Sequence, residues 1–272
     1  MPELPEVETT KRGIAPHIVG KKIQNVIVRQ RQLRWLIESD FENNLLNETI
    51  TSVERRAKYL LIKTQNGTLI VHLGMSGNLR IVTDSTPANF HDHVDIVLDE
   101  NTVLRFNDQR RFGALVWTTS SDVLKHPLLR DLGVEPLTDD FTSELLFQLS
   151  RRKRMPIKTF LMNGKIVVGV GNIYANEALF LAEILPTRHA GDLSVTDCGK
   201  LFFYIREVLA RAIEQGGTTL RDFVNADGKG GYFQQQLHVY GRGLLPCTKC
   251  NQPLIEIRLT NRTTVFCSHC QK

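Results

Sequence analysis

The apolar residues change their spacing part-way along the chain, and this change predicts two differently built regions. From about Lys22 to Thr119 they form short runs between turn residues, which is the pattern of β-strands. The runs at 59–64 and 68–73 flank an Asn-Gly pair, which favours a tight hairpin turn, and 94–98 and 103–107 form a similar pair. We therefore expect an antiparallel β-sandwich or barrel in this region.

Helical spacing of apolar residues frames the β-rich region. Before it, residues 3–18 combine an apolar face with acidic residues in the first turn, where the helix dipole favours them. After it, residues 172–185 predict one helix, and a second is expected from a capping box of Ser194 and Asp197 to Gly216-Gly217. The expected fold class is α+β, with more than one domain.

Composition restricts the function classes. The chain is 42% hydrophobic and 23% charged, as globular proteins are. No stretch approaches the roughly 18 apolar residues of a membrane span, and the acidic N-terminus is unlike a signal peptide. We therefore expect a cytoplasmic protein with no membrane partner.

The basic residues are clustered, which is more informative than the net charge of +5. Residues 150–170 hold six Lys or Arg and no Asp or Glu. One such run is usually a solvated surface, whereas several in one chain favour phosphate contacts. The other clusters are Arg29, Arg31 and Arg34; Arg55, Arg56 and Lys58; and Arg105, Arg110 and Arg111.

Four cysteines near the C-terminus have the spacing of a metal site. Two C-x-x-C pairs are separated by sixteen residues, and four thiolates at this spacing predict one structural Zn²⁺. Disulfides are the poorer alternative in a cytosolic protein. The residues between the pairs predict a hairpin of 255–259 and 263–266 with Arg262 near its tip. The ligands would be Cys247, Cys250, Cys267 and Cys270.

The HDHVD stretch at 91–95 offers an alternative, a catalytic metal site. Side chains alternate along a strand, so His91, His93 and Asp95 would share one face with Asp92 opposite. No other residue in the sequence supplies a clear further ligand. A metal-dependent hydrolase is therefore the weaker interpretation.

The N-terminus could carry a nucleophile. Once Met1 is removed, Pro2 would expose a secondary amine, which is a free base more often at pH 7 than a lysine amine is. Such an amine can attack an electrophilic carbon and give an iminium ion. Glu3 and Glu6 are near enough in sequence to assist it. The alternative is an ordinary acidic helix start.

Several stretches in order along nearly the whole chain resemble bacterial formamidopyrimidine-DNA glycosylases. They are MPELPEVETT (1–10), RRAKYLL (55–61), HLGMSG (72–77), HDHVD (91–95), RRFGA (110–114), VGVGNIYANE (168–177), EQGGTTLRDF (214–223) and the four-cysteine hairpin. The related endonuclease VIII branch typically starts PEGPE, so Leu4 favours the purine-lesion branch.

The resemblance implies an enzyme of DNA base excision repair, both glycosylase and abasic-site lyase, for oxidised purines such as 8-oxoguanine and formamidopyrimidines. Pro2 would attack C1′ of the damaged nucleotide and form a Schiff base, with Glu3 as general acid. Lys58 would assist β-elimination, and Arg262 δ-elimination.

The resemblance also implies the residues that bind DNA. Extrusion of a damaged base costs a few kcal/mol of stacking, and a wedge of side chains fills the gap. Arg154 stands where Lys is common in the family, and Gln109 stands where Pro is common. These two departures put the exact geometry of the DNA contacts in doubt, but not the activity. The loop from Gly216 to Tyr232 would cover the flipped base. The implied wedge is Met75, Arg110 and Phe112, and the other expected DNA contacts are Glu6, His91, Arg154, Lys158 and Asn172.

The predicted organisation has three parts: a catalytic β-sandwich domain at 1–135, a helix-two-turn-helix domain at 136–232 and a zinc finger at 233–272. The expected partner is double-stranded DNA with oxidised bases or abasic sites, bound by a monomer, and catalysis itself needs no metal. Two alternatives stay open: an endonuclease VIII-like glycosylase for pyrimidine lesions, and a non-enzymatic zinc-ribbon DNA-binding protein.

Overall fold

The computed structural model describes residues 2–119, 121–217 and 237–272. The chain divides into two compact units, Met1–Arg130 with Gln215–Tyr232, and Asp131–Glu214 with Phe233–Lys272. Most of the loop expected to cover a flipped base, from residue 218 on, lies outside the described residues. Among the helices that are described, none is both long enough and apolar enough to cross a membrane.

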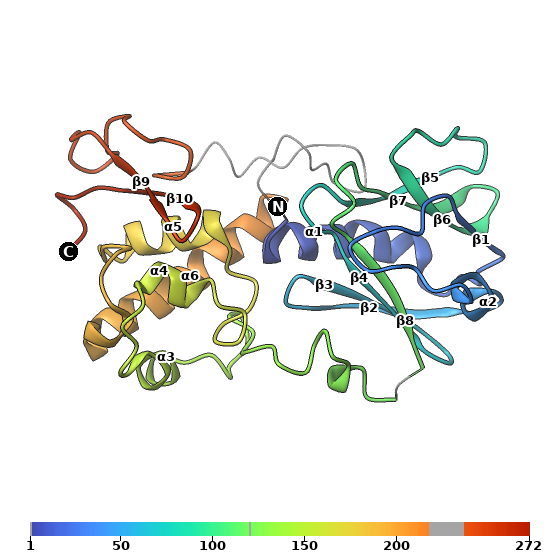
Figure 1. Cartoon of the computed structure of the whole chain (residues 1–272), viewed down its shortest axis with the longest axis horizontal. Helices are drawn as coiled ribbons and strands as arrows, with labels where there is room; N and C mark the ends of the chain where they lie inside the picture. Colours follow the sequence, from blue (N-terminus) through green and yellow to red (C-terminus); the bar gives the residue numbers. More distant parts are fainter. Residues whose placement is uncertain (1, 120, 218–236) are drawn as a thin grey trace. The chain divides into compact units, whose positions relative to one another are not determined.

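The first unit is a helix followed by two antiparallel four-stranded sheets (Figure 1), which confirms the expected sandwich. One sheet has the order β1-β6-β7-β5 and the other β2-β3-β4-β8. The elements are α1 (Leu4–Ile18), β1 (Asn25–Val28), α2 (Phe41–Leu45), β2 (Ile50–Arg56), β3 (Tyr59–Thr64), β4 (Thr68–His72), β5 (Asn78–Val82), β6 (Asp92–Asp99), β7 (Thr102–Asn107), β8 (Ala114–Thr118) and a 3₁₀ turn at Val123–Lys125.

Both predicted hairpins of the first unit are present. Strands β3 and β4 pair antiparallel, and the turn closes where the Thr64 amide donates to the Gly67 carbonyl at 2.8 Å. Strands β6 and β7 form the second hairpin. Helix α1 adds Val7, Ile14 and Ile18 to an apolar core shared with strands of both sheets, which fixes the helix on the sandwich.

The second unit is helical and ends in a two-stranded hairpin. Helix α6 begins at the predicted capping box, because the Asp197 amide donates to Ser194 Oγ at 3.1 Å and the Ser194 amide to Asp197 Oδ2 at 3.0 Å. Its elements are α3 (Ser143–Ser150), α4 (Ile157–Leu161), α5 (Asn172–Leu181), a 3₁₀ turn at Ala190–Asp192, α6 (Val195–Glu214), β9 (Ile255–Leu259) and β10 (Arg262–Phe266).

Helix α5 is shorter than its apolar pattern predicts. It ends at Leu181, because Glu183 adopts a left-handed backbone conformation with φ of 63° that cannot continue a helix. The chain then pairs with the C-terminus: the Leu185 amide donates to the Lys272 carbonyl at 3.1 Å, and the Lys272 amide to the Glu183 carbonyl at 2.9 Å. Periodicity alone could not reveal this contact between distant segments.

Candidate active site and DNA interface

The N-terminus of α1 holds the predicted nucleophile. Glu3 is the N-cap residue, and its side chain accepts from the Glu6 backbone amide while the Glu3 amide donates to Glu6 Oε2 at 2.8 Å. Pro2, directly before this capping box, is buried, and Glu3 and Glu6 are 2% and 0% exposed. The acidic helix start and the proposed reaction centre are therefore the same structure.

Lys58 lies in the tight turn between β2 and β3, where Ala57 has a φ of 55°. A nearly buried ion pair fastens this turn to α1, since Arg55 Nε lies 3.0 Å from Glu8 Oε2. Burial raises the pKa of Glu8, but hydrogen bonds and charges from Lys11 and Arg55 outweigh burial and lower it. The pair fixes the Lys58 turn relative to the helix that begins with Pro2.

His72, the last residue of β4, is a second basic group near Lys58. Burial lowers the pKa of His72 to about 4, and the positive charges of Lys58 and Arg34 lower it further in the same direction. The ring is therefore neutral at pH 7. Its Nδ1 accepts from the Gly74 amide at 3.1 Å, which anchors the start of the next loop.

The expected wedge residues lie on two loops of the first unit. Met75 is half-buried in the turn between β4 and β5, and Arg110 and Phe112 are exposed in the loop between β7 and β8. The Arg110 guanidinium lies over the Phe112 ring, 5.1 Å from its centre, so cation and aromatic form one unit. The loops are bound together, since the Arg110 amide donates to Ser76 Oγ at 3.0 Å.

The second unit holds the helix start that was expected to bind phosphate. Gly171 caps α5, and Gly169 needs its φ of 80° to make the turn before it. Asn172, the first residue of α5, has a buried side-chain oxygen with no hydrogen-bond partner among the described residues. Arg154 is exposed and borders a surface cleft of about 440 Å³ together with Lys153 and His189. These groups are of the kind that binds a phosphate backbone.

The four cysteines fit one tetrahedral Zn²⁺. Their sulfurs all lie within 4.8 Å of one another, with 4.0 Å between Cys247 and Cys270 and 3.5 Å between Cys250 and Cys267. Zinc–sulfur bonds of about 2.3 Å place tetrahedral sulfurs about 3.8 Å apart, so the separations match. Burial raises the pKa of Cys267, but backbone N–H groups of Cys270 and His269 and neighbouring thiols bring it down to about 7.

The hairpin presents Arg262 as predicted. Thr260 and Asn261 both have positive φ, which makes the two-residue turn of the primed type, and the exposed Arg262 follows as the first residue of β10.

Lys158, expected to contact DNA, is instead 1% exposed. Its ammonium donates to the Thr263 carbonyl at 2.8 Å and to Thr264 Oγ1 at 2.7 Å. Lys158 therefore ties α4 to the hairpin.

Comparison with known proteins decides the family. A family model for the formamidopyrimidine-DNA glycosylase N-terminal domain matches residues 1–115. A second family model, for the formamidopyrimidine-DNA glycosylase H2TH domain, matches residues 132–224. The formamidopyrimidine-DNA glycosylase of Marinobacter nauticus is 58% identical, and that of Saccharophagus degradans 56%, over 272 residues that are 100% of each chain.

The chain belongs to the formamidopyrimidine-DNA glycosylase family. It is accordingly a DNA glycosylase of base excision repair. A Lactococcus lactis Fpg mutant in complex with Fapy-dG-containing DNA superposes with a TM-score of 0.94 at 33% identity, over 100% of both chains. The MutM (Fpg) protein of Thermus thermophilus has a TM-score of 0.89 at 38% identity, over 99% of this chain and 98% of that chain.

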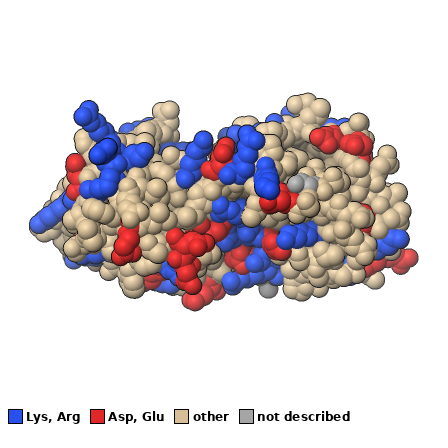
Figure 2. All heavy atoms as spheres, turned by 90° about the horizontal axis from the view of Figure 1, so that it is seen from below, with Lys and Arg blue, Asp and Glu red and all other residues tan. Residues whose placement is uncertain are grey.

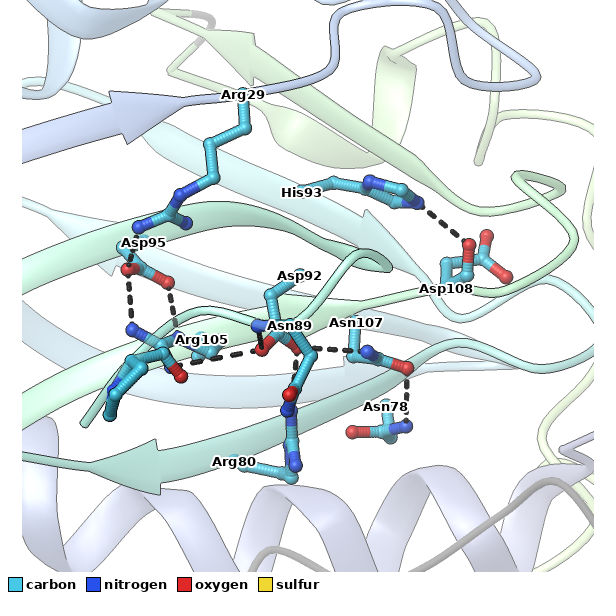
Figure 3. Close-up of polar contacts among 11 residues, drawn as sticks. Arg29, Asn78, Arg80, Asn89, Asp92, His93, Asp95, Arg105, Asn107 and Asp108 are labelled. Carbon is cyan, nitrogen blue, oxygen red and sulfur yellow. Dashed lines mark hydrogen bonds and ion pairs between the residues drawn. The ribbon is translucent and has the colours of Figure 1, made fainter.

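The glycosylase does not use HDHVD as a metal site. Asp95 is occupied by Arg105 at 2.7 Å and by Arg29 at 2.6 Å, and His93 Nε2 donates to the Asp108 carbonyl at 2.8 Å (Figure 3). Among the described residues, the cysteine quartet is the only group that could hold a metal ion. The metal-dependent hydrolase is therefore the wrong interpretation.

The basic clusters of the glycosylase are partly internal, so some of their side chains are paired inside the protein. Arg105 is 3% exposed between Asp95 and Asp92, and Arg55 pairs with Glu8. The face in Figure 2 carries both Lys or Arg and Asp or Glu side chains. The exposed cations, such as Arg110 and Arg262, are the candidates for binding DNA.

Sequence reasoning missed a buried carboxylate in the family's GNIYANE stretch. Glu177 is 1% exposed and accepts from three successive backbone amides, those of His238, Val239 and Tyr240, at 2.8, 2.9 and 2.8 Å. It holds the segment that leads into the cysteine hairpin. Only its place inside the motif could have pointed to it, because an acidic residue on a helix is usually solvated.

Proposed function

We propose that the enzyme removes oxidised purines from duplex DNA and then cleaves the abasic strand, with Pro2 as its nucleophile. The observation that carries this proposal is the buried capping box, in which Pro2 directly precedes two carboxylates withdrawn from solvent. Two buried carboxylates at a helix start are unnecessary for capping, which a single exposed Ser or Asp achieves. Their burial beside an amine is expected of a reaction centre.

The chemistry requires a free amine. After Met1 is removed, the Pro2 nitrogen attacks C1′, the glycosidic bond breaks with its electron pair leaving on the base, and the Pro2 N–H proton passes to the departing base. Glu3 gives a proton to the sugar ring oxygen as the ring opens, which leaves an iminium ion between Pro2 and C1′. That iminium ion accepts the electron pair when C2′ loses a proton, and the resulting enamine expels the 3′ phosphate, which leaves with the electron pair of the C3′–O bond. Lys58 would assist this β-elimination, and Arg262 the δ-elimination that follows.

The remaining residues would bind and distort the duplex. Met75, Arg110 and Phe112 would fill the gap left by the extruded nucleotide, with Arg110 bonding the orphaned cytosine. His91, Arg154 and Asn172 would contact the backbone, and Glu6 the base pocket. A bound Zn²⁺ would lock the cysteine hairpin so that Arg262 is held in place. We propose that one subunit suffices and that the enzyme acts in the cytoplasm, where bacterial DNA lies.

A pyrimidine-lesion glycosylase is the second candidate. One Lactococcus lactis Fpg structure, with a TM-score of 0.92 and 33% identity over 100% of both chains, contains DNA with an oxidised pyrimidine. Leu4, which is 0% exposed, stands where the pyrimidine branch typically has Gly, and this favours purines. Comparing excision of 8-oxoguanine with excision of an oxidised pyrimidine separates the two candidates.

The test of the mechanism is covalent trapping. The protein is incubated with an 8-oxoguanine:cytosine duplex and borohydride, in a chelator mild enough to leave zinc in place. We expect a reduced adduct that maps to Pro2 by mass spectrometry. In a matched preparation that keeps Met1, the Pro2 nitrogen is part of a peptide bond. This preparation should give no adduct at Pro2. Absence of adduct and of strand cleavage with the Met1-free protein contradicts the proposal.

A further inference from the structure

Asp108, directly after β7, connects the loops that carry Met75, Arg110 and His91, although no role was predicted for it. It is 0% exposed. Its Oδ1 accepts from Ser76 Oγ at 2.7 Å, in the loop of Met75, and its Oδ2 accepts from the Gly113 amide at 2.7 Å, in the loop of Arg110 and Phe112. One buried carboxylate therefore joins the two loops that carry the wedge.

The backbone of Asp108 extends the connection to β6. Its amide donates to the His91 carbonyl at 3.1 Å, and its carbonyl accepts from His93 Nε2 at 2.8 Å (Figure 3). His91 is thus held to the same residue as the wedge loops.

The two wedge loops meet with no space between them. A Cβ on Gly74 would lie 2.4 Å from the Phe112 carbonyl carbon and 2.5 Å from the Gly113 nitrogen. Ser76, 2% exposed, fills the junction, and the Arg110 amide donates to both Ser76 Oγ and Asp108 Oδ1, at 3.0 and 3.3 Å. The main chain of Arg110 is therefore fixed, whereas its side chain is exposed.

We propose that the Ser76–Asp108 pair positions Arg110 and thereby sets the preference for cytosine opposite the lesion. The inference rests on the proposed function, in which Arg110 bonds that cytosine. A planar guanidinium distinguishes bases only when its direction is held, and here the direction starts from a main chain anchored on Asp108. Without the anchor, Arg110 keeps its charge and can still bind DNA, but its guanidinium is no longer held in one direction. Ser76 and Asp108 are positioning residues, since they act through Arg110.

The test measures opposite-base preference in Ser76→Ala and Asp108→Asn. Single-turnover excision of 8-oxoguanine is compared opposite cytosine and opposite adenine, and borohydride trapping on an abasic-site duplex serves as a reference. Ser52→Ala, on strand β2, is the matched control. We expect the cytosine-to-adenine rate ratio to fall about tenfold in Ser76→Ala, the loss equivalent to one hydrogen bond of about 1.4 kcal/mol. Trapping should fall by a smaller factor, and the control should keep the wild-type ratio.

The outcomes are distinct. If both excision rates and trapping fall together while the ratio stays constant, the pair is merely structural and the inference is overturned. A wild-type ratio in Ser76→Ala overturns it as well, even where Asp108→Asn fails to fold. Wild-type protein that neither excises nor traps contradicts the proposed function itself, which is a different result.

Discussion

The start of α1 and the cysteine hairpin are both needed for the proposed function, but they are held in place differently. The helix belongs to the large apolar core of the sandwich through Val7, Ile14 and Ile18. The hairpin packs on a small cluster of six buried residues, two of which are cysteines. A core of that size stabilises a segment poorly without metal or other anchors.

Because of this difference, we expect catalysis and DNA binding to respond to different perturbations. The proposed reaction centre is held in place by burial, whereas the hairpin would be held by Zn²⁺ and by two buried polar anchors, Lys158 and Glu177. Perturbing the hairpin should therefore weaken DNA binding while the reaction centre stays intact. Perturbing the N-terminus should do the reverse.

Blocking the Pro2 amine should have the largest effect. A Gly-Ser extension before Pro2 removes the nucleophile, and we expect excision to fall by about 10⁴-fold or more, as when other enzymatic nucleophiles are removed. Affinity for an abasic-site duplex, measured by fluorescence anisotropy, should change far less. Equal losses of affinity and activity would break the proposed separation.

Loss of zinc should give the opposite result. In Cys247→Ser, or after a strong chelator, the hairpin unfolds, and we expect duplex affinity to fall at least about tenfold because metal binding supplies the hairpin's folding free energy. Hydrogen exchange should show protection lost in 247–270 and kept in α1. Full DNA affinity in Cys247→Ser would contradict the role given to the hairpin.

Glu177→Gln should destabilise the segment that enters the hairpin. The amide cannot accept from three backbone N–H groups as the carboxylate does, and we expect a loss of about 3 kcal/mol. Hydrogen exchange at 238–240 measures it. Glu207→Gln, on the partly exposed side of α6, is the control and should leave this protection unchanged.

Acid should weaken the first unit through His72. Its folded pKa of about 4 lies below the unfolded value of 6.5, so the unfolded chain binds the proton first. The contribution of His72 to the free energy of unfolding is complete above pH 6.5 and is lost as the pH falls toward 4. At pH 5 the free energy of unfolding should be about 2 kcal/mol lower than at neutral pH. Urea unfolding of wild type and His72→Asn at pH 7 and pH 5 measures the difference. An equal pH response in both proteins would show that His72 is not the cause.

Lys158→Met should have the smallest effect. It removes the two hydrogen bonds from α4 to the hairpin while keeping the apolar stem, at a cost of about 1–2 kcal/mol. We expect a lower share of δ-elimination product on gels, because Arg262 is held less well. Lys165→Met, an exposed change in the same basic run, is the control. If Lys165→Met has the larger effect, surface charge matters more than hairpin position.

Local signals in the sequence predicted much of the fold. The Asn-Gly hairpin, the Ser194–Asp197 capping box and the cysteine spacing were all confirmed, because each depends on residues a few positions apart. The predicted end of α5 was wrong, since the observed end depends on pairing with the C-terminus. Roles of single site residues stay predictions, although the structure does bring Pro2, Glu3 and Glu6 together.

By itself the sequence determined the family, the position of the proposed nucleophile and the candidate metal ligands, because these depend on short motifs. Tertiary structure decided which charges are available to DNA. Lys158 finds its partners 105 and 106 positions away, and Arg105 finds Asp95 on the neighbouring strand, so both are internal. Arg110 is exposed, although its main-chain amide is bound to the buried Asp108. A charge in a sequence shows neither its partner nor its burial, and both are set by the packing of distant segments.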